Sequence, residues 1–142
     1  MLFDDTLRLL LQKARTIAIV GAKDKKGQAV DMVGRYLMDV GYNVIPVHPV
    51  RKQVWGLPTY TCLAEVPEPI DIVNLFRASQ YCPEHARETL ALSSRPSLFW
   101  MQEGIGSAEA GSLLMLAKIA VVEDACIMID HRRLLGGLKR EQ

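Results

Sequence analysis

The sequence has few cysteines and no long apolar run, and each of these absences excludes a class of protein. Its three cysteines, Cys62, Cys82 and Cys126, are odd in number and far apart, which fits neither a disulfide framework nor closely spaced zinc ligands. No apolar run approaches the roughly 20 residues that span a bilayer, and the amino terminus lacks the features of a secretory signal peptide. We therefore expect a cytoplasmic protein in a reducing compartment, without a membrane partner.

The chain also lacks an excess of either charge. It has 17 Lys and Arg against 16 Asp and Glu, a formal net charge of +1, whereas nucleic-acid binding usually shows as a basic excess. The three histidines, His48, His85 and His131, have no partner at the spacing of a zinc-protease motif. We expect no nucleic-acid partner and no metal, and any basic site must be local.

Short apolar runs alternate with segments of helical spacing along the 142 residues. The apolar runs predict five strands, at 16–20, 43–49, 70–76, 97–101 and 119–123. Helical spacing predicts helices at 3–15, 30–40, 83–92, 107–118 and 126–134. Alternation of this kind favours parallel strands joined by right-handed crossovers. The prediction is a single doubly wound, Rossmann-like α/β domain over 1–142, with a five-stranded parallel sheet and an amino-terminal helix, within 1–15, packed on it.

Individual residues mark the ends of these elements. Asp4 and Asp5 suit the N-cap and the positive end of the first helix, and Ser107 suits the N-cap of the fourth. Gly41 can take the left-handed conformation that ends helices. The proline-rich segment 50–69 predicts an irregular connection with one short helical turn.

Residues that follow the predicted strands mark the expected ligand site. In doubly wound sheets, ligands bind at the carboxyl ends of the strands, where the chain reverses direction beside the first strand. Gly21, His48, Phe76 and Gln102 each lie at or just after the end of a predicted strand. We therefore expect these four residues to gather at one edge of the sheet.

The stretch TIAIVGAKDKKGQAV begins like a dinucleotide-binding motif but lacks the second glycine of that motif. Gly21 ends the strand and Gly27 precedes a helix, whose first amides and dipole favour an anion. Lys23, Lys25 and Lys26 add local positive charge, although lysines in a turn are often only solvated. The loop predicts a phosphate site.

The end of the second strand narrows the choice of ligand. NAD-binding enzymes usually place an acidic residue there to hydrogen-bond the ribose hydroxyl. Here His48 and Pro49 are followed by Val50, Arg51 and Lys52, and basic side chains would instead attract a phosphate on the ribose. This favours NADP or coenzyme A (CoA) over NAD.

Five segments taken in order, IAIVGA, GYNVIPVHP, TYTCLAEVPEPIDIVNLFR, LFWMQEG and VVEDACIMIDHRRL, resemble a family of small CoA-binding proteins. The single domain of that family is similar to the CoA-binding domain of the succinyl-CoA synthetase α subunit. The resemblance covers roughly 16–135. It implies that CoA is the ligand and that Gly21, Ala22 and the following loop hold its phosphates. It also implies that Arg51 lies near the adenosine phosphates and that Phe76 and Arg77 line the adenine pocket.

The chain departs from the family pattern at three positions. The family often has Ser directly after Gly-Ala, and Arg and Ser near the start of the helix, whereas this chain has Lys23, Gln28 and Val30. Phosphate binding by backbone amides would survive these changes, but side-chain hydrogen bonds from these positions would not. The predicted cofactor-binding residues are Gly21, Ala22, Lys23, Lys25, Gly27, His48, Pro49, Arg51, Phe76 and Arg77.

A chemical role would have to use Cys126, a residue that the family shares. On a helix, Cys126 and Asp130 share a face, and a helix terminus or the nearby His131 can lower the pKa of a thiol. The family often has Arg before this cysteine, where this chain has Ala125. Two interpretations stay open: a thiol site, with a mixed disulfide to CoA as one form, or a small apolar residue in the packing.

One five-stranded domain uses the whole sequence, so we expect a binding module without catalysis of its own. Its ligand would be CoA or an acyl-CoA, and it would act as a carrier, a sensor or a subunit. Two alternatives remain: an NADP-binding oxidoreductase subunit or redox regulator, and a ligand-free protein-interaction module, suggested by Gln28 and Val30. A second copy of the chain or another protein stays open as a partner.

Overall fold

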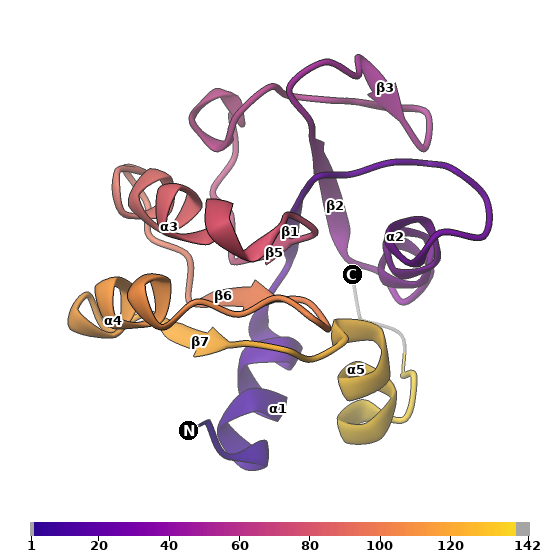
Figure 1. The fold of residues 1–142 in the computed structure, drawn as a ribbon. Helices are drawn as coiled ribbons and strands as arrows, with labels where there is room; N and C mark the ends of the chain where they lie inside the picture. Colours follow the sequence, from indigo (N-terminus) through magenta and orange to yellow (C-terminus); the bar gives the residue numbers. More distant parts are fainter. Residues whose placement is uncertain (1, 139–142) are drawn as a thin grey trace.

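The computed structural model describes residues 2–138 and has a five-stranded parallel sheet between two layers of helices (Figure 1). The strands are β1 (Thr16–Val20), β2 (Asn43–Val47), β5 (Ile72–Leu75), β6 (Leu98–Met101) and β7 (Ala120–Val122). They lie in the order β2-β1-β5-β6-β7. The predicted doubly wound α/β fold is confirmed, and each of these five strands lies inside its predicted range or equals it.

Helices cover both faces of the sheet. One face carries α1 (Asp4–Lys13), α2 (Ala29–Asp39) and α5 (Ile127–Leu135). The other carries α3 (Cys82–Leu90), α4 (Ala108–Leu116) and a short 3-10 helix, η1 (Leu63–Glu65), while a second one, η2 (Ser79–Tyr81), leads into α3. None of the helices in residues 2–138 is long and apolar enough to cross a membrane.

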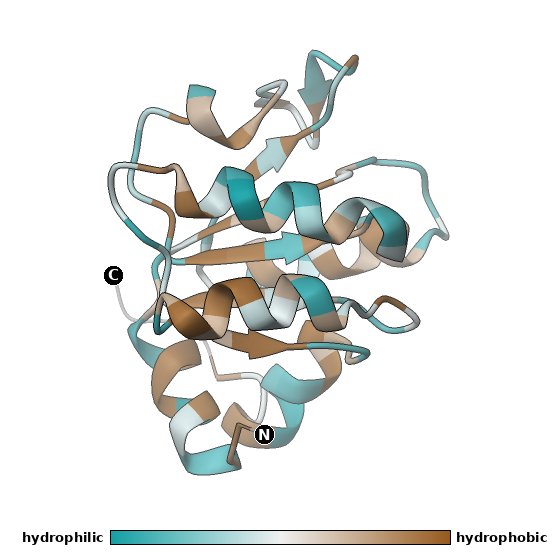
Figure 2. Ribbon diagram, turned by 60° about the vertical axis from the view of Figure 1, so that its left-hand side comes forward, coloured by the Kyte–Doolittle hydropathy of each residue, from teal (hydrophilic) through white to brown (hydrophobic). Residues whose placement is uncertain are grey.

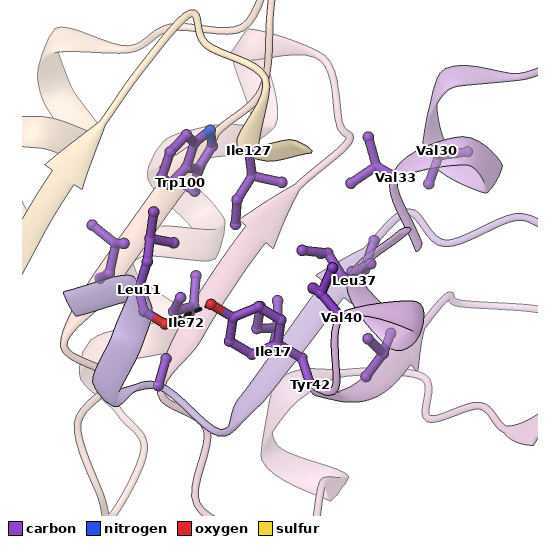
Figure 3. Packing of buried hydrophobic residues seen from close by; sticks show 14 of the residues in the cluster. Leu11, Ile17, Val30, Val33, Leu37, Val40, Tyr42, Ile72, Trp100 and Ile127 are labelled. Atoms are coloured by element: carbon purple, nitrogen blue, oxygen red, sulfur yellow. Dashed lines mark hydrogen bonds between the residues drawn. The ribbon is translucent and has the colours of Figure 1, made fainter. Parts of the chain in front are cut away.

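Strand residues alternate between two apolar layers, and both layers are buried. Ile17 and Ile19 point toward α1, α2 and α5, whereas Ala18 and Val20 point toward α3 and α4. Figure 3 shows the first layer, in which the Tyr42 hydroxyl donates a hydrogen bond to the carbonyl of Leu11. Burial on both sides explains why the strand sequences are almost wholly apolar rather than alternating.

The chain reverses direction at β1. After β2 on one side of β1, it crosses to β5 on the other side, which opens a crevice at the carboxyl ends of these strands. Gly21 lies directly in this crevice with φ +87°, and a Cβ there would be 2.4 Å from the carbonyl oxygen of Phe76. Glycine is therefore required at this turn.

The connection 50–69 is more regular than its prolines predicted. It contains an antiparallel hairpin, β3 (Gln53–Val54) and β4 (Leu57–Pro58), as well as the one short helical turn that was expected, η1. Trp55 and Gly56 form the two-residue turn, with φ of 55° and 70°, the signs of a type I′ turn. Sequence reasoning missed the hairpin because bulky residues rarely adopt positive φ.

Of the two predicted N-caps, the first is wrong and the second is confirmed. Phe3, not Asp4 or Asp5, is the N-cap of α1 and supplies no side-chain cap, so the two carboxylates contribute only through their place in the first turn. Ser107 does cap α4, since its Oγ accepts a hydrogen bond from the amide of Ala110 at 3.1 Å.

Gln102 does not face the ligand edge as predicted. It is buried, and its Oε1 accepts hydrogen bonds from the Ile127 amide at 3.0 Å and from Asn74 Nδ2 at 3.4 Å. Since the Ile127 amide opens α5, Gln102 satisfies a helix end inside the molecule.

Candidate functional site

A cavity of about 380 Å³ lies at the carboxyl ends of β1 and β2, beside α3. Its lining includes four of the predicted site residues, Gly21, His48, Pro49 and Arg77. The remaining lining residues are Val20, Val47, Thr61, Cys62, Glu84, His85 and Glu88. The cavity therefore occupies the place where a doubly wound sheet binds its ligand.

His48 forms the centre of a positively charged cluster. Its Nδ1 accepts hydrogen bonds from the amides of Val50 and Arg51, both at 3.1 Å, so the ring proton lies on Nε2. Partial burial lowers the pKa of His48, and the charges of Arg51, Lys23 and Arg77 lower it further. Three cations from three different loops thus act on one imidazole, and such a cluster attracts a phosphate.

Asp24 forms an ion pair with one of these cations, Arg51. Its Oδ1 lies 3.7 Å from Arg51 Nη1, and its Oδ2 accepts a hydrogen bond from the Trp55 amide at 3.2 Å. Asp24 therefore ties the loop after β1 to the turn of the hairpin. Sequence reasoning passed over it because three lysines surround it in the chain.

Two backbone amides in the loop after β1 are already hydrogen-bonded within the protein and are not free to bind a phosphate. The amides of Gly21 and Ala22 both donate to the carbonyl of Val47, at 2.9 and 3.3 Å. At the end of the loop, the N-cap Gln28 supplies no side-chain hydrogen bond to α2. The amides of Ala29 and Val30, in the first turn of α2, are thus the donors best placed for an anion.

The hairpin lies against α2, and Trp55 holds it there. The indole Nε1 donates to Asp31 Oδ1 at 2.8 Å, and Asp31, which is buried, also accepts from Arg35. The indole ring covers Gly34, where a Cβ would lie 2.2 Å from it. Trp55 therefore fixes the segment that carries Arg51, and Figure 1 shows this hairpin on the same side of the molecule as the loop before α2.

The remaining predicted residues lie outside the cavity lining. Phe76 packs against the apolar layer on the α1, α2 and α5 face, so only Arg77 of that pair borders the cavity. The Arg77 guanidinium lies 4.3 Å from the centre of the Tyr81 ring. Lys25 and Gly27 belong to the loop before α2, and both are exposed.

A histidine and a glutamate form the α3 side of the cavity. His85 Nδ1 lies 3.0 Å from Glu88 Oε1, and Glu88 Oε2 accepts from the Leu63 amide at 2.8 Å. Burial raises the pKa of Glu88, but the hydrogen bonds from His85 and Leu63 outweigh it, and the pKa lies below its usual value. Sequence reasoning gave His85 no role, yet its side chain is only 14% exposed; its i,i+3 spacing to Glu88 was the available signal.

The groups around Cys126 are not brought together. Cys126 is the half-buried N-cap residue of α5, one residue before the helix, and its carbonyl accepts from the Asp130 amide. The Asp130 carboxylate pairs with Arg133 at 3.3 Å, and His131 Nδ1 lies 2.6 Å from the Tyr36 hydroxyl. Neither side chain therefore serves the thiol. Within residues 2–138, no cluster of His, Cys, Asp and Glu is arranged to hold a metal ion.

Comparisons with known proteins find a family match over most of the chain. Residues 15–132 match the family model of a CoA binding domain. The chain is 35% identical over 125 residues to the uncharacterized protein YneT of Bacillus subtilis (strain 168), covering 88% of this chain and 91% of that protein. It is 26% identical over 129 residues to trans-feruloyl-CoA synthase FCS1 from an unknown prokaryotic organism, covering 89% of this chain but 18% of the synthase.

A solved structure is similar over almost the whole chain. It is that of cell-free ID.343 from Thermus thermophilus, with 38% sequence identity and a TM-score of 0.88, and the match covers 94% of this chain and 99% of that one.

Proposed function

Because the chain belongs to the family of CoA binding domains, we propose that it binds CoA or an acyl-CoA as a stand-alone module. It would act as a carrier, a sensor or a subunit, without catalysis of its own. The observation that carries this proposal is the cavity in the crevice of the sheet, lined by His48 and Arg77, together with the charges of Arg51 and Lys23, which act on His48 from outside the lining.

The parts of CoA fit the parts of this site. CoA carries a pyrophosphate and a separate phosphate on its ribose, and both need cations or amide donors. Arg51 and Lys23 supply the charge, and the first turn of α2 supplies amides. The cavity has an apolar side, formed in part by Val20, Val47 and Pro49, which suits the flat face of a base.

Two observations favour binding without catalysis. The sequence suggested one catalytic set, formed by Cys126, Asp130 and His131. In the structure Asp130 pairs with Arg133 and His131 with Tyr36, so neither side chain is paired with the thiol. The match to the feruloyl-CoA synthase covers 18% of that enzyme, so most of the synthase has no counterpart in this chain.

Calorimetric titration of the purified protein tests the proposal. CoA and acetyl-CoA should bind, and ADP and NAD should bind more weakly, because they lack the ribose phosphate. Arg51→Glu should weaken CoA binding by tenfold or more, since it places a negative charge among the cations. Arg95→Glu is the matched control: Arg95 is exposed and precedes β6, at the opposite edge of the sheet, so this variant should bind CoA as the natural protein does.

The basic end of β2 also favours NADP, which carries a ribose phosphate too. A titration in which NADP binds more tightly than CoA would replace the proposal with a redox role. A folded protein that binds neither ligand at millimolar concentration would leave the protein-interaction module as the remaining reading.

A further inference from the structure

The α3 wall of the cavity contains a histidine with one nitrogen that the folded chain does not pair. His85 borders the cavity, and its Nδ1 lies 3.0 Å from Glu88 Oε1. Its Nε2 is buried and has no hydrogen-bond partner within residues 2–138. A buried polar atom without a partner is costly, and folded proteins rarely keep one. This nitrogen is therefore a candidate contact for a bound molecule.

Glu88 decides which kind of partner this nitrogen takes. Its Oε2 accepts from the Leu63 amide at 2.8 Å, and its hydrogen bonds hold its pKa below the usual value. The carboxylate is therefore ionised and can only accept. In the neutral imidazole of His85 we assign the proton to Nδ1, which faces Glu88, so Nε2 carries a lone pair and needs a donor.

The other polar side chains at this wall have partners of their own. The Thr61 hydroxyl and the Cys62 thiol both donate to Glu65 Oε1. The Arg77 guanidinium lies over the Tyr81 ring, 4.3 Å from its centre. A donor for the His85 nitrogen is therefore expected from a bound molecule.

Charge indicates which part of CoA lies at this wall. Glu84 and Glu88 both border the cavity on the α3 side, and Figure 2 shows α3 as largely hydrophilic, whereas α4 is mostly hydrophobic. Two carboxylates repel a phosphate, while the cations Lys23 and Arg51 act from the loops after β1 and β2. The phosphates therefore belong with the cations, and a neutral part of the ligand belongs beside α3.

Shape narrows this neutral part to the adenine base. The strand side of the cavity includes the apolar side chains of Val20, Val47 and Pro49, on which a flat ring can pack. Adenine has such a ring, and its 6-amino group is a hydrogen-bond donor. The pantetheine arm of CoA also carries N–H groups, but it is flexible and has no ring.

We propose that His85 is a specificity-determining residue, whose Nε2 accepts a hydrogen bond from the 6-amino group of the adenine of bound CoA. Glu88 is then a positioning residue, because it fixes the proton on the other ring nitrogen. This inference rests on the proposed binding of CoA. Hypoxanthine, the deaminated form of adenine, has a carbonyl oxygen in place of the amino group, so two acceptors would face each other. The site should therefore select adenine over hypoxanthine.

Calorimetric titration with CoA, and with CoA whose adenine has been deaminated to hypoxanthine, tests this selection. At about pH 8.5 histidine side chains are usually neutral, and the natural protein should bind CoA at least about tenfold more tightly than the deaminated form. His85→Phe keeps a ring but removes the acceptor, so the two ligands should bind this variant with nearly equal affinity. Circular dichroism verifies that it is folded.

Glu88→Gln gives the sharper test, because it keeps the shape of the side chain. Its single carbonyl oxygen is needed by the Leu63 amide, so its amide nitrogen faces His85 Nδ1 and donates to it. The ring proton then moves to Nε2, which becomes a donor. The variant should therefore prefer the hypoxanthine form, a reversal that a merely structural role of Glu88 would not produce.

Glu84→Gln is the matched control. Glu84 borders the same cavity from the same helix, and the hydrogen bond to His85 within residues 2–138 comes from Glu88 instead. This variant removes one carboxylate charge and should keep the natural preference for adenine. A Glu88→Gln variant that also keeps it would overturn the role of Glu88.

The titrations separate this inference from the proposed function. If the natural protein binds CoA and its deaminated form with equal affinity, the inference is wrong and the proposed CoA binding stands. If a folded natural protein binds neither, both are wrong. A preference for adenine that survives in His85→Phe would assign the selection to another residue and overturn the role of His85.

Discussion

Gly21 and Gly27 both have a positive φ, but only Gly21 is in close contact with a neighbouring residue. Alanine substitutions at the two positions should therefore separate the cost of the contact from the cost of the backbone conformation. Gly21→Ala would put a Cβ 2.4 Å from the Phe76 carbonyl at φ +87°, whereas Gly27→Ala at φ +90° would meet nothing within 4 Å. We expect Gly27→Ala to lower the free energy of unfolding by about 1 kcal/mol, for its backbone alone. Gly21→Ala should lower it by about 3 kcal/mol or more. Urea unfolding measures both, and equal losses would show that the contact with Phe76 relaxes easily.

Asp24 competes with any phosphate for Arg51. Asp24→Asn removes the charge that lies 3.7 Å from Arg51 but keeps an oxygen for the Trp55 amide. The variant should bind CoA about two- to fivefold more tightly, which corresponds to a partly exposed ion pair worth up to ~1 kcal/mol. Asp39→Asn makes the same charge change at the far end of α2 and should have no effect. Weaker CoA binding by Asp24→Asn would mean that Asp24 positions Arg51 rather than occupying it.

The pKa of His48 should report ligand binding. In the free protein it lies below the ordinary value of 6.5, through burial and then the charges of Arg51, Lys23 and Arg77. A bound phosphate offsets those charges and raises the pKa, so binding takes up a proton at pH values between the free and bound pKa. CoA affinity should therefore increase as the pH falls through that window.

Calorimetry at about pH 6, near the pKa of an unperturbed His, in buffers of different ionisation enthalpy, measures this uptake. His48→Asn is the matched variant, because its Oδ1 can accept from the Val50 and Arg51 amides but does not titrate. Any uptake by the phosphate itself occurs in both proteins. Equal uptake in the two would remove His48 from the phosphate site.

At the scale of single residues, the sequence predicted the position of those residues that directly follow a strand. Gly21, His48 and Arg51 belong to this group, because the carboxyl ends of parallel strands must meet at one edge. Asp24 and Glu88 could not be found in this way. Their importance depends on contacts with Arg51 and His85, and side-chain contacts across loops leave no periodic pattern in a sequence.

At the scale of helices and strands, we expect that the packing of Trp55 on Gly34 holds the β3–β4 hairpin to α2. Gly34→Ala would put a Cβ 2.2 Å from the indole, so the ring must leave and the hairpin must loosen. We expect faster proteolysis within 51–58 and red-shifted tryptophan emission, even though alanine favours the helix by about 1 kcal/mol.

Gly111→Ala is the control for this prediction, because it brings the same helix preference on α4 with no atom within 4 Å of the new Cβ. It should leave both the hairpin's proteolysis rate and the emission unchanged. Unchanged proteolysis in Gly34→Ala would mean that the Trp55–Asp31 hydrogen bond holds the hairpin without close ring packing.

The strands and helices were more predictable than the connection that carries this hairpin. Apolar runs and helical spacing reflect burial on one or both sides, which the strands and helices share over many residues. The turn at Trp55 instead has a bulky residue at φ 55°, held by a hydrogen bond to Asp31 and by contact with Gly34. Tertiary contacts on α2 thus select a turn that local preference disfavours.

For the whole molecule, the order of the sheet joins distant segments into one site. The cavity draws on the ends of β1 and β2, on η1's N-cap and on α3, and the cations come from the loops after β1, β2 and β5. The alternation of strands and helices predicted this edge, because a doubly wound sheet leaves its crevice there. The side of the crevice on which the cavity lies depends on side-chain volumes, so it could not be predicted from the sequence.

Because the site exists only when all these segments are folded, CoA should stabilise the domain as a unit. A ligand that binds only the native state adds about 2.7 kcal/mol at a hundred times its dissociation constant. For a domain of this size, that should raise the melting temperature by roughly 5–10 °C. The shift should grow with the logarithm of CoA concentration and should shrink in Arg51→Glu but not in Arg95→Glu. Calorimetric scans measure it, and an unchanged melting temperature in a cooperatively folding protein would contradict CoA binding at this edge.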